Sequence, residues 1–138
     1  MSYQVYLLTV FYLCLSALVL LADEYGGKSH LLLWLKNSVS GSFYTHLCLI
    51  IVGVLLTSWK IFKPVAPGPL LLGDLLPVVG LLIMSVYYTV QLRHFKGEGK
   101  LKVVEQTSDY LERHKRNLGY FLLATAALHF LFPRAVLI

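Results

Sequence analysis

The sequence is poor in charge. Of its 138 residues, 14% are charged and 57% are hydrophobic, and the mean hydropathy is +0.70, whereas a soluble domain usually has about 25% charged residues. The hydrophobic residues gather in four long blocks instead of short segments broken by polar turns. This pattern excludes a water-soluble globule and predicts an all-α integral membrane protein with a single four-helix domain.

Reactive motifs are lacking as well. The chain has no glycine loop with a following lysine, no paired cysteines, no HExxH and no GxSxG elbow. Cys14 and Cys48 both lie inside apolar blocks, where we interpret them as small core residues. We therefore predict no catalytic residue, no metal site and no cofactor, and we favour a non-catalytic protein over an enzyme.

The positive charge does not indicate nucleic-acid binding. The net charge of +5 comes from 12 Lys and Arg against 7 Asp and Glu. These basic residues lie between the apolar blocks and not on one soluble face with stacking aromatics. They therefore indicate how the chain is oriented in a membrane.

The four blocks predict membrane spans at about 3–22, 44–62, 75–93 and 117–132. About 20 residues cross a hydrocarbon core, and only the fourth block is clearly shorter. A cleaved signal peptide is the alternative for the first block, but no Lys or Arg precedes it. Near the end of the second block, Trp59 and Lys60 are expected at the membrane surface, with the lysine reaching out to the headgroups.

Basic residues are unequally divided between the two sides. Segments 23–43 and 94–116, with the adjoining Arg93, hold nine Lys and Arg, and the other side holds three. The positive-inside bias makes the nine cytoplasmic, so both termini and the proline-rich loop 63–74 are predicted to be non-cytoplasmic. A bacterial inner membrane and a eukaryotic endomembrane remain alternatives.

Both cytoplasmic segments contain helical patterns. Residues 31–35 are too few to cross a membrane, and they predict a helix lying in the interface. In the second segment Val104 and Leu111 share one face, and Glu112 and Arg116 form an acid-before-base pair four residues apart. Candidate residues for docking a partner or acidic lipids are Lys96, Lys100, Lys102, Arg113, Lys115 and Arg116.

Two polar residues are candidates for an intramembrane site. Asp74 precedes the third span and is interpreted as its N-cap, with Pro77 in the first turn; a proton or cation site is the alternative. His129 is expected to face inward with Thr125 one turn earlier.

Small residues indicate where helices approach one another closely. Gly53 and Thr57 form a pair four residues apart, and Ala124, Ala126 and Ala127 thin one part of the fourth block.

The two halves of the chain resemble each other in order. Each has a span, a Gly and Lys segment, an amphipathic segment, a second span and an aromatic-proline exit, at an offset of 69 to 72 residues. Such halves would be parallel repeats, related by an axis along the membrane normal. Coincidence is the alternative.

The run from Glu112 to Asn117 resembles the Arg and Asn motif of small four-span glutathione-handling membrane enzymes. The resemblance covers under a tenth of the chain. In that family the motif opens the second span, whereas here it precedes the fourth, so the activity is not carried over.

These patterns lead to three functional hypotheses. The first is a non-catalytic accessory or scaffold subunit of a larger membrane complex, whose partners are the bilayer, other membrane subunits and acidic lipids. The second is a homo-oligomeric transporter, channel or lipid-handling protein with Asp74 and His129 near its path. The third is a membrane enzyme that uses Arg113, Arg116 and Asn117.

Overall fold

The computed structural model describes residues 2–62, 75–95 and 102–131. These residues form only helices, so the expected all-α class is confirmed for the described part of the chain. In order they are α1 (Ser2–Tyr25), the short 3-10 helix η1 (Gly26–Lys28), α2 (His30–Ser40), α3 (Phe43–Phe62), α4 (Leu75–Phe95) and α5 (Lys102–Leu131).

Three stretches are long and apolar enough to cross a membrane. They are Tyr3–Lys28, Phe43–Phe62 and Leu75–Arg93, and they match the first three predicted spans. The fourth predicted span is the second half of α5. It is not among these three, because its apolar part is shorter and continues directly from a charged segment.

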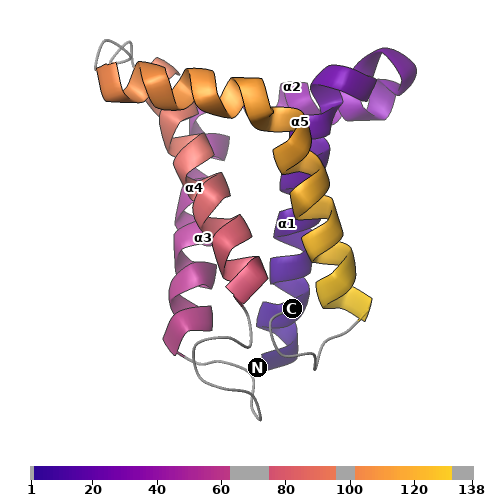
Figure 1. The fold of residues 1–138 in the computed structure, drawn as a ribbon. Coiled ribbons are helices and arrows are strands. Elements are labelled where there is room, and N and C mark those ends of the chain that lie inside the picture. The colour runs from indigo at the N-terminus through magenta and orange to yellow at the C-terminus, as the bar shows by residue number, and fades with distance from the viewer. Residues whose placement is uncertain (1, 63–74, 96–101, 132–138) are drawn as a thin grey trace.

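The long helices form a bundle that is covered at one end (Figure 1). α1 packs mainly against α5, and α3 packs mainly against α4. The first half of α5 lies across the end of the bundle that also carries α2, and its second half runs alongside α1. We call this end the capped end, and the opposite end, where α1 begins and α5 ends, the far end. The basic segment is thus continuous with the fourth apolar block in one helix.

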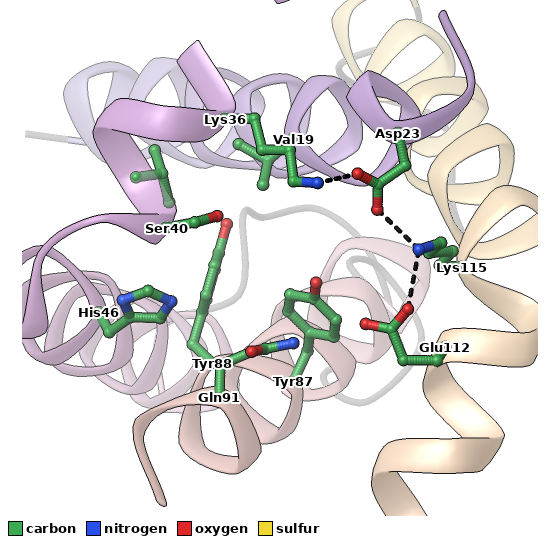
Figure 2. Close-up of a pocket in the computed structure, with 11 residues that line it drawn as sticks. Val19, Asp23, Lys36, Ser40, His46, Tyr87, Tyr88, Gln91, Glu112 and Lys115 are labelled. Atoms are coloured by element: carbon green, nitrogen blue, oxygen red, sulfur yellow. Dashed lines mark hydrogen bonds and ion pairs between the residues drawn. The ribbon is translucent and has the colours of Figure 1, made fainter. Parts of the chain in front are cut away.

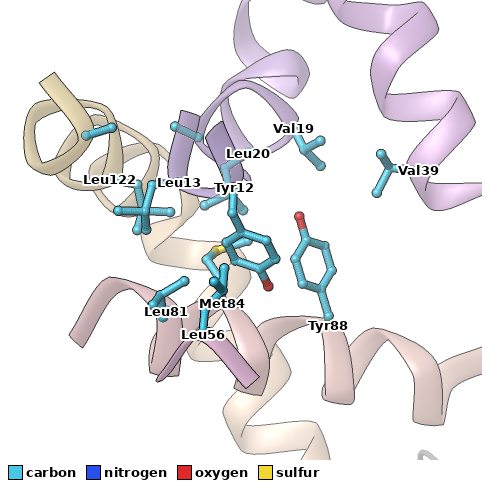
Figure 3. Packing of buried hydrophobic residues seen from close by; sticks show 12 residues of the cluster. Tyr12, Leu13, Val19, Leu20, Val39, Leu56, Leu81, Met84, Tyr88 and Leu122 are labelled. Atoms are coloured by element: carbon cyan, nitrogen blue, oxygen red, sulfur yellow. The ribbon is translucent and has the colours of Figure 1, made fainter. Parts of the chain in front are cut away.

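The main core joins α1, α3, α4 and α5, and Val39 of α2 belongs to it as well. Figure 3 shows Tyr12 and Tyr88 among aliphatic side chains from all five α-helices. Small residues permit this packing. A Cβ on Gly119 would lie only 2.8 Å from Cγ of Leu21 in α1, so a larger residue at this position would push α5 away from α1. The expected close approach at Gly53 is also present, against α1 and α4.

Other small residues do not lie where the sequence placed them. Of the three expected alanines, Ala126 is buried, but Ala124 and Ala127 are exposed. Cys14 is half-buried and Cys48 is exposed, so the interpretation of Cys48 as a core residue is wrong. Cys48 belongs to an apolar face of α3 that packs on no other described helix. The sequence could not show this, because in a block that is apolar on all sides the inner and outer faces look alike.

A smaller core fixes the first half of α5 to α4. Val104 and Leu111 are buried there with Val90, as expected from their spacing on one helix face. The expected pair between Glu112 and Arg116 is wrong, because each side chain reaches a different partner, as described below.

Candidate functional site

An ion-paired cluster lies at the capped end and joins three helices. Asp23, in the last turn of α1, pairs with Lys36 of α2 through one carboxylate oxygen. Its other oxygen accepts a hydrogen bond of 2.7 Å from Nζ of Lys115 in α5. The same Nζ donates to Glu112 at 2.8 Å. Two carboxylates and two ammonium groups therefore meet in one network.

Lys115 is the centre of this network. Partial burial lowers the pKa of Lys115, but its hydrogen bonds to Asp23 and Glu112 outweigh burial and raise that pKa well above the ordinary value. Lys115 thus remains charged at physiological pH and links α5 to α1.

The cluster forms one wall of a cavity of about 360 Å³. Figure 2 shows the ion pairs on one side, the rings of Tyr87 and Tyr88 in the middle, and His46 on the other side. All five α-helices contribute, and the lining residues are Val19, Asp23, Lys36, Val39, Ser40, His46, Tyr87, Tyr88, Gln91, Glu112 and Lys115. The cavity therefore offers carboxylates, ammonium groups and hydroxyls in one space.

His46 is held in a defined orientation at the start of α3. Its Nδ1 lies 3.0 Å from the carbonyl oxygen of Ser42, so Nδ1 carries the proton and donates. The imidazole packs edge-on to the ring of Tyr88, with 5.9 Å between centroids. His46 is thereby directed to the cavity and not to solvent.

Polar side chains continue from the cavity into the bundle. The Tyr88 hydroxyl donates to Oγ of Ser16 at 3.3 Å. Further along the axis, the Tyr12 hydroxyl donates to the carbonyl oxygen of Leu49 at 3.0 Å. A Cβ on Gly53 would meet both Tyr12 Oη and Ser85 Oγ, which places these two hydroxyls together. Buried hydroxyls thus occupy the middle of an apolar bundle.

A second polar cluster is buried near the far end. Nζ of Lys60 in α3 lies 3.2 Å from Nε2 of His129 in α5. Lys60 is 4% exposed and His129 is 2% exposed. The Tyr6 hydroxyl of α1 donates to the backbone oxygen of His129. The interpretation of Lys60 as a lysine reaching out to the headgroups is therefore wrong.

The structure places the candidate residues predicted from the sequence in different surroundings. His129 is buried beside Thr125, as expected. Arg116 pairs with Glu24 of α1 at 3.2 Å, and Lys115 belongs to the cluster at the capped end. Lys102 and Arg113 are exposed. Three candidates lie outside the described residues, namely Asp74, Lys96 and Lys100.

Several residues at these sites were not predicted, although the sequence contains a signal for some of them. Asp23 directly follows the first apolar block, where an acid is as unusual as at Asp74. Gly53, Thr57 and Lys60 are spaced by four and three residues, which places them on one helix face. That spacing indicates that Lys60 faces the same neighbours as Gly53.

Metal binding finds no geometric support in the described part of the chain. Among residues 2–62, 75–95 and 102–131, no three His, Cys, Asp or Glu side chains are grouped as metal ligands.

One protein-family model, from a family of unknown function, matches residues 1–129. No curated protein and no solved structure matches the chain.

Proposed function

We propose that this chain, which belongs to the family of unknown function matched over residues 1–129, is a small multi-pass membrane protein that binds and passes a small zwitterionic solute. One observation carries the proposal: charged and hydroxyl side chains from all five α-helices line one cavity at the capped end of an apolar bundle. Such groups are costly to place beside a membrane-embedded core, and by default they indicate a functional site.

The charge balance of the cavity favours a zwitterion. Asp23 and Glu112 supply two negative charges, and Lys36 and Lys115 supply two positive charges. A solute with one ammonium and one acidic group can exchange partners with these ion pairs and leave no charge unmatched. A solute of a single charge would leave one partly buried group without an opposite charge, which is unfavourable.

We further propose that the second half of α5 crosses the membrane with α1, α3 and α4. Three features support four spans: this half runs alongside α1 in Figure 1, its inner residues Leu122 and Ala126 are fully buried, and the basic residues favour one side by nine to three. The capped end would then be cytoplasmic and both termini non-cytoplasmic.

The pairing of helices also supports the internal repeat. In each half of the chain a first span, α1 or α4, packs mainly on the second span of the other half, α5 or α3. A two-fold axis along the membrane normal would produce this pairing.

Topology is tested with single cysteines in a background without Cys14 and Cys48. We expect Lys102→Cys, at the first residue of α5, to react with an impermeant maleimide only after the cytoplasmic side is opened, and Leu131→Cys, at the last described residue of α5, to react from the opposite side. Labelling of both positions from the same side would contradict the four-span arrangement.

The solute is tested by thermal unfolding of the purified protein in nanodiscs, with glycine as the zwitterion, acetate as the matched anion and methylammonium as the matched cation. A ligand at 100 times its Kd stabilises a folded protein by about 2.7 kcal/mol. We expect glycine or a larger zwitterion of the same series to raise Tm, and the two single-charge compounds to have no effect.

The matched variants are Lys36→Met, which removes one positive charge from the cavity, and Lys102→Met, which removes an exposed lysine on α5. Lys36→Met should abolish the increase in Tm with the zwitterion, and Lys102→Met should retain it. A zwitterion effect that survives Lys36→Met unchanged, or no effect of any zwitterion, would contradict the proposal.

The accessory subunit remains the second candidate, and one surface favours it. In the first half of α5, the side chain of Val103 is 73% exposed. Lys102 and Arg113 are exposed on the same half of this helix. A larger membrane subunit or acidic lipids could cover this surface. To separate the two candidates, the protein is extracted in mild detergent, the mass of the native particle is measured, and the co-purifying chains are identified. Stoichiometric foreign subunits favour the accessory function. A particle that contains this chain alone contradicts it.

A further inference from the structure

The capped end holds a second cavity, of about 460 Å³, which is more open than the first. We call it the outer cavity, and we call the cavity of about 360 Å³ the inner cavity. The described residues that line the outer cavity all belong to α1 or α5, namely Asp23, Glu24, Glu112, Arg113, Lys115, Arg116 and Asn117. We propose that Lys115 is a gate between the two cavities, which the solute passes on its way from the outer to the inner one. Only the nature of the solute rests on the proposed function, since the gate itself is defined by the contacts of Lys115.

The two cavities meet at the ion-paired cluster. Asp23, Glu112 and Lys115 line both of them. These are the same three residues that the hydrogen bonds of Lys115 join. Their side chains are partly exposed, which agrees with a thin wall between two open spaces. The contacts of Lys115 therefore form the wall that separates the cavities.

The wall is closed by one contact between helices. Nζ of Lys115 in α5 lies 2.7 Å from Oδ2 of Asp23 in α1, so no atom of a solute fits between them. The other contact of Lys115, with Glu112 at 2.8 Å, lies within α5 because the two residues are only three positions apart. Breaking the contact with Asp23 is thus enough to open the wall.

Opening the wall leaves no charge of the cluster without a partner. Asp23 keeps its pair with Lys36 through the other carboxylate oxygen. Lys115 keeps its pair with Glu112. The large cost of leaving a partly buried charge unpaired is thereby avoided. A lysine has a flexible side chain with three donors, so Nζ can turn away from Asp23 while it still donates to Glu112. The gate moves one side chain and no helix.

The outer cavity offers first contacts to a solute that carries both charges. Besides the three shared residues, its lining supplies the guanidinium groups of Arg113 and Arg116, the carboxylate of Glu24 and the amide of Asn117. Guanidinium groups bind carboxylates through charge-assisted hydrogen bonds, and carboxylates bind ammonium groups in the same way. Both ends of a zwitterion therefore find partners before the wall is reached.

A zwitterion can also release the gate. Its acidic group can accept from Nζ of Lys115 in place of Asp23, and its ammonium group can donate to Asp23 in place of Lys115. This exchange replaces one ion pair by two and needs no change of protonation. A solute with a single charge replaces only one side of the pair, so it leaves the other side without compensation.

The gate is tested by the rate at which 2-hydroxyethyl methanethiosulfonate, a small neutral reagent, modifies single cysteines. The full chain is used in nanodiscs, in a background without Cys14 and Cys48 and with no solute present. Val19→Cys reports on the inner cavity, because Val19 lines it, is 4% exposed and lies one turn before Asp23 in α1. Asn117→Cys reports on the outer cavity. We expect Asn117→Cys to react faster than Val19→Cys.

Three lysine variants are then compared in each reporter. Lys115→Met should raise the rate at Val19→Cys by about two- to fivefold, because a partly exposed ion pair shifts an equilibrium by up to about this factor. Lys115→Arg retains the positive charge and should keep the slow rate. Lys102→Met, at an exposed lysine of α5, should also keep it. The rate at Asn117→Cys should be the same in all variants. If Lys115→Met does not yield folded protein, Asp23→Asn replaces it, with the same expectation.

Three results would overturn the gate. The first is a rate at Val19→Cys as high as that at Asn117→Cys in the protein with Lys115 intact. The second is no increase at Val19→Cys on loss of the contact between Lys115 and Asp23, and the third is an equal increase with Lys115→Arg. None of these measurements involves a solute, so failure of the gate and failure of the zwitterion experiment are observed separately.

Discussion

Gly53 gives the sharpest test of the packing inside the bundle. A Cβ built at this position would lie 2.7 Å from both Tyr12 Oη and Ser85 Oγ, and 3.2 Å from Cζ of Tyr12. Carbon and oxygen do not approach so closely, so Gly53→Ala must displace Tyr12, Ser85 or the helix itself. The Tyr12 hydroxyl would then lose its 3.0 Å contact with the carbonyl oxygen of Leu49.

The cost of Gly53→Ala can be worked out from three effects. Overpacking a core costs about 1–3 kcal/mol, and a hydrogen bond inside a membrane protein is worth about 0.6 kcal/mol, at most about 1.7. Alanine regains up to about 1 kcal/mol through its helix propensity. We therefore expect Gly53→Ala to lower the free energy of unfolding by about 1–4 kcal/mol.

The assay is reversible unfolding in mixed micelles, followed by tryptophan fluorescence. Gly27→Ala is the matched control, because nothing lies within 4 Å of a Cβ at Gly27, and we expect a change within about 0.5 kcal/mol. The same Gly53→Ala change is then made in a Tyr12→Phe/Ser85→Ala background, where both oxygens are gone. Its cost should fall there by about 1 kcal/mol or more. An equal cost in both backgrounds would refute the close approach of these hydroxyls.

Three further predictions concern the ion pairs and the cysteines. Asp23→Asn removes the charge that pairs with two lysines. Because these ion pairs are partly exposed, we expect Asp23→Asn to lower the unfolding free energy by about 1 kcal/mol. Glu24→Gln, which removes the more exposed pair with Arg116, should leave the unfolding free energy unchanged within error. The pKa of Lys115 is raised in the folded state, so the stabilising effect of this lysine is fully present below its ordinary pKa of 10.5 and is lost as the pH rises further. The unfolding free energy of the wild type should therefore fall above pH 10.5, and the unfolding free energy of Lys115→Met should fall less. A hydrophobic maleimide should label the exposed Cys48 faster than the half-buried Cys14 in nanodiscs, and equal rates would contradict the assignment of the outer face of α3.

Hydrophobic block length predicted much of the fold. The first three blocks became α1, α3 and α4, with ends within a few residues of the predicted limits. The short helix over 31–35 was also found, as α2. These features depend on local composition and helix geometry, which a single sequence contains. The continuity of α5 was less accessible, since its charged half and its apolar half look like separate segments.

The candidate site was harder to predict because it depends on which helices become neighbours. Asp23 and Lys115 are 92 residues apart, and no local spacing relates them. Glu112 and Arg116 show how misleading local spacing can be, since both prefer partners at other positions. Lys60 was assigned to the surface from its place near the end of a span, although the helix face it occupies points inward.

The pairing of α1 with α5 has a consequence for how the protein is made. Ribosomes deliver α1 well before α5, yet among the described residues α5 is the helix against which α1 packs most extensively. Until α5 has been synthesised, Leu20 and Leu21 of α1 lack the close surface that Gly119 provides. Membrane insertion can therefore place α1 early, but the bundle closes only when α5 arrives. A nascent chain stalled before α5 would present an unmatched first helix to the quality-control proteases of the membrane.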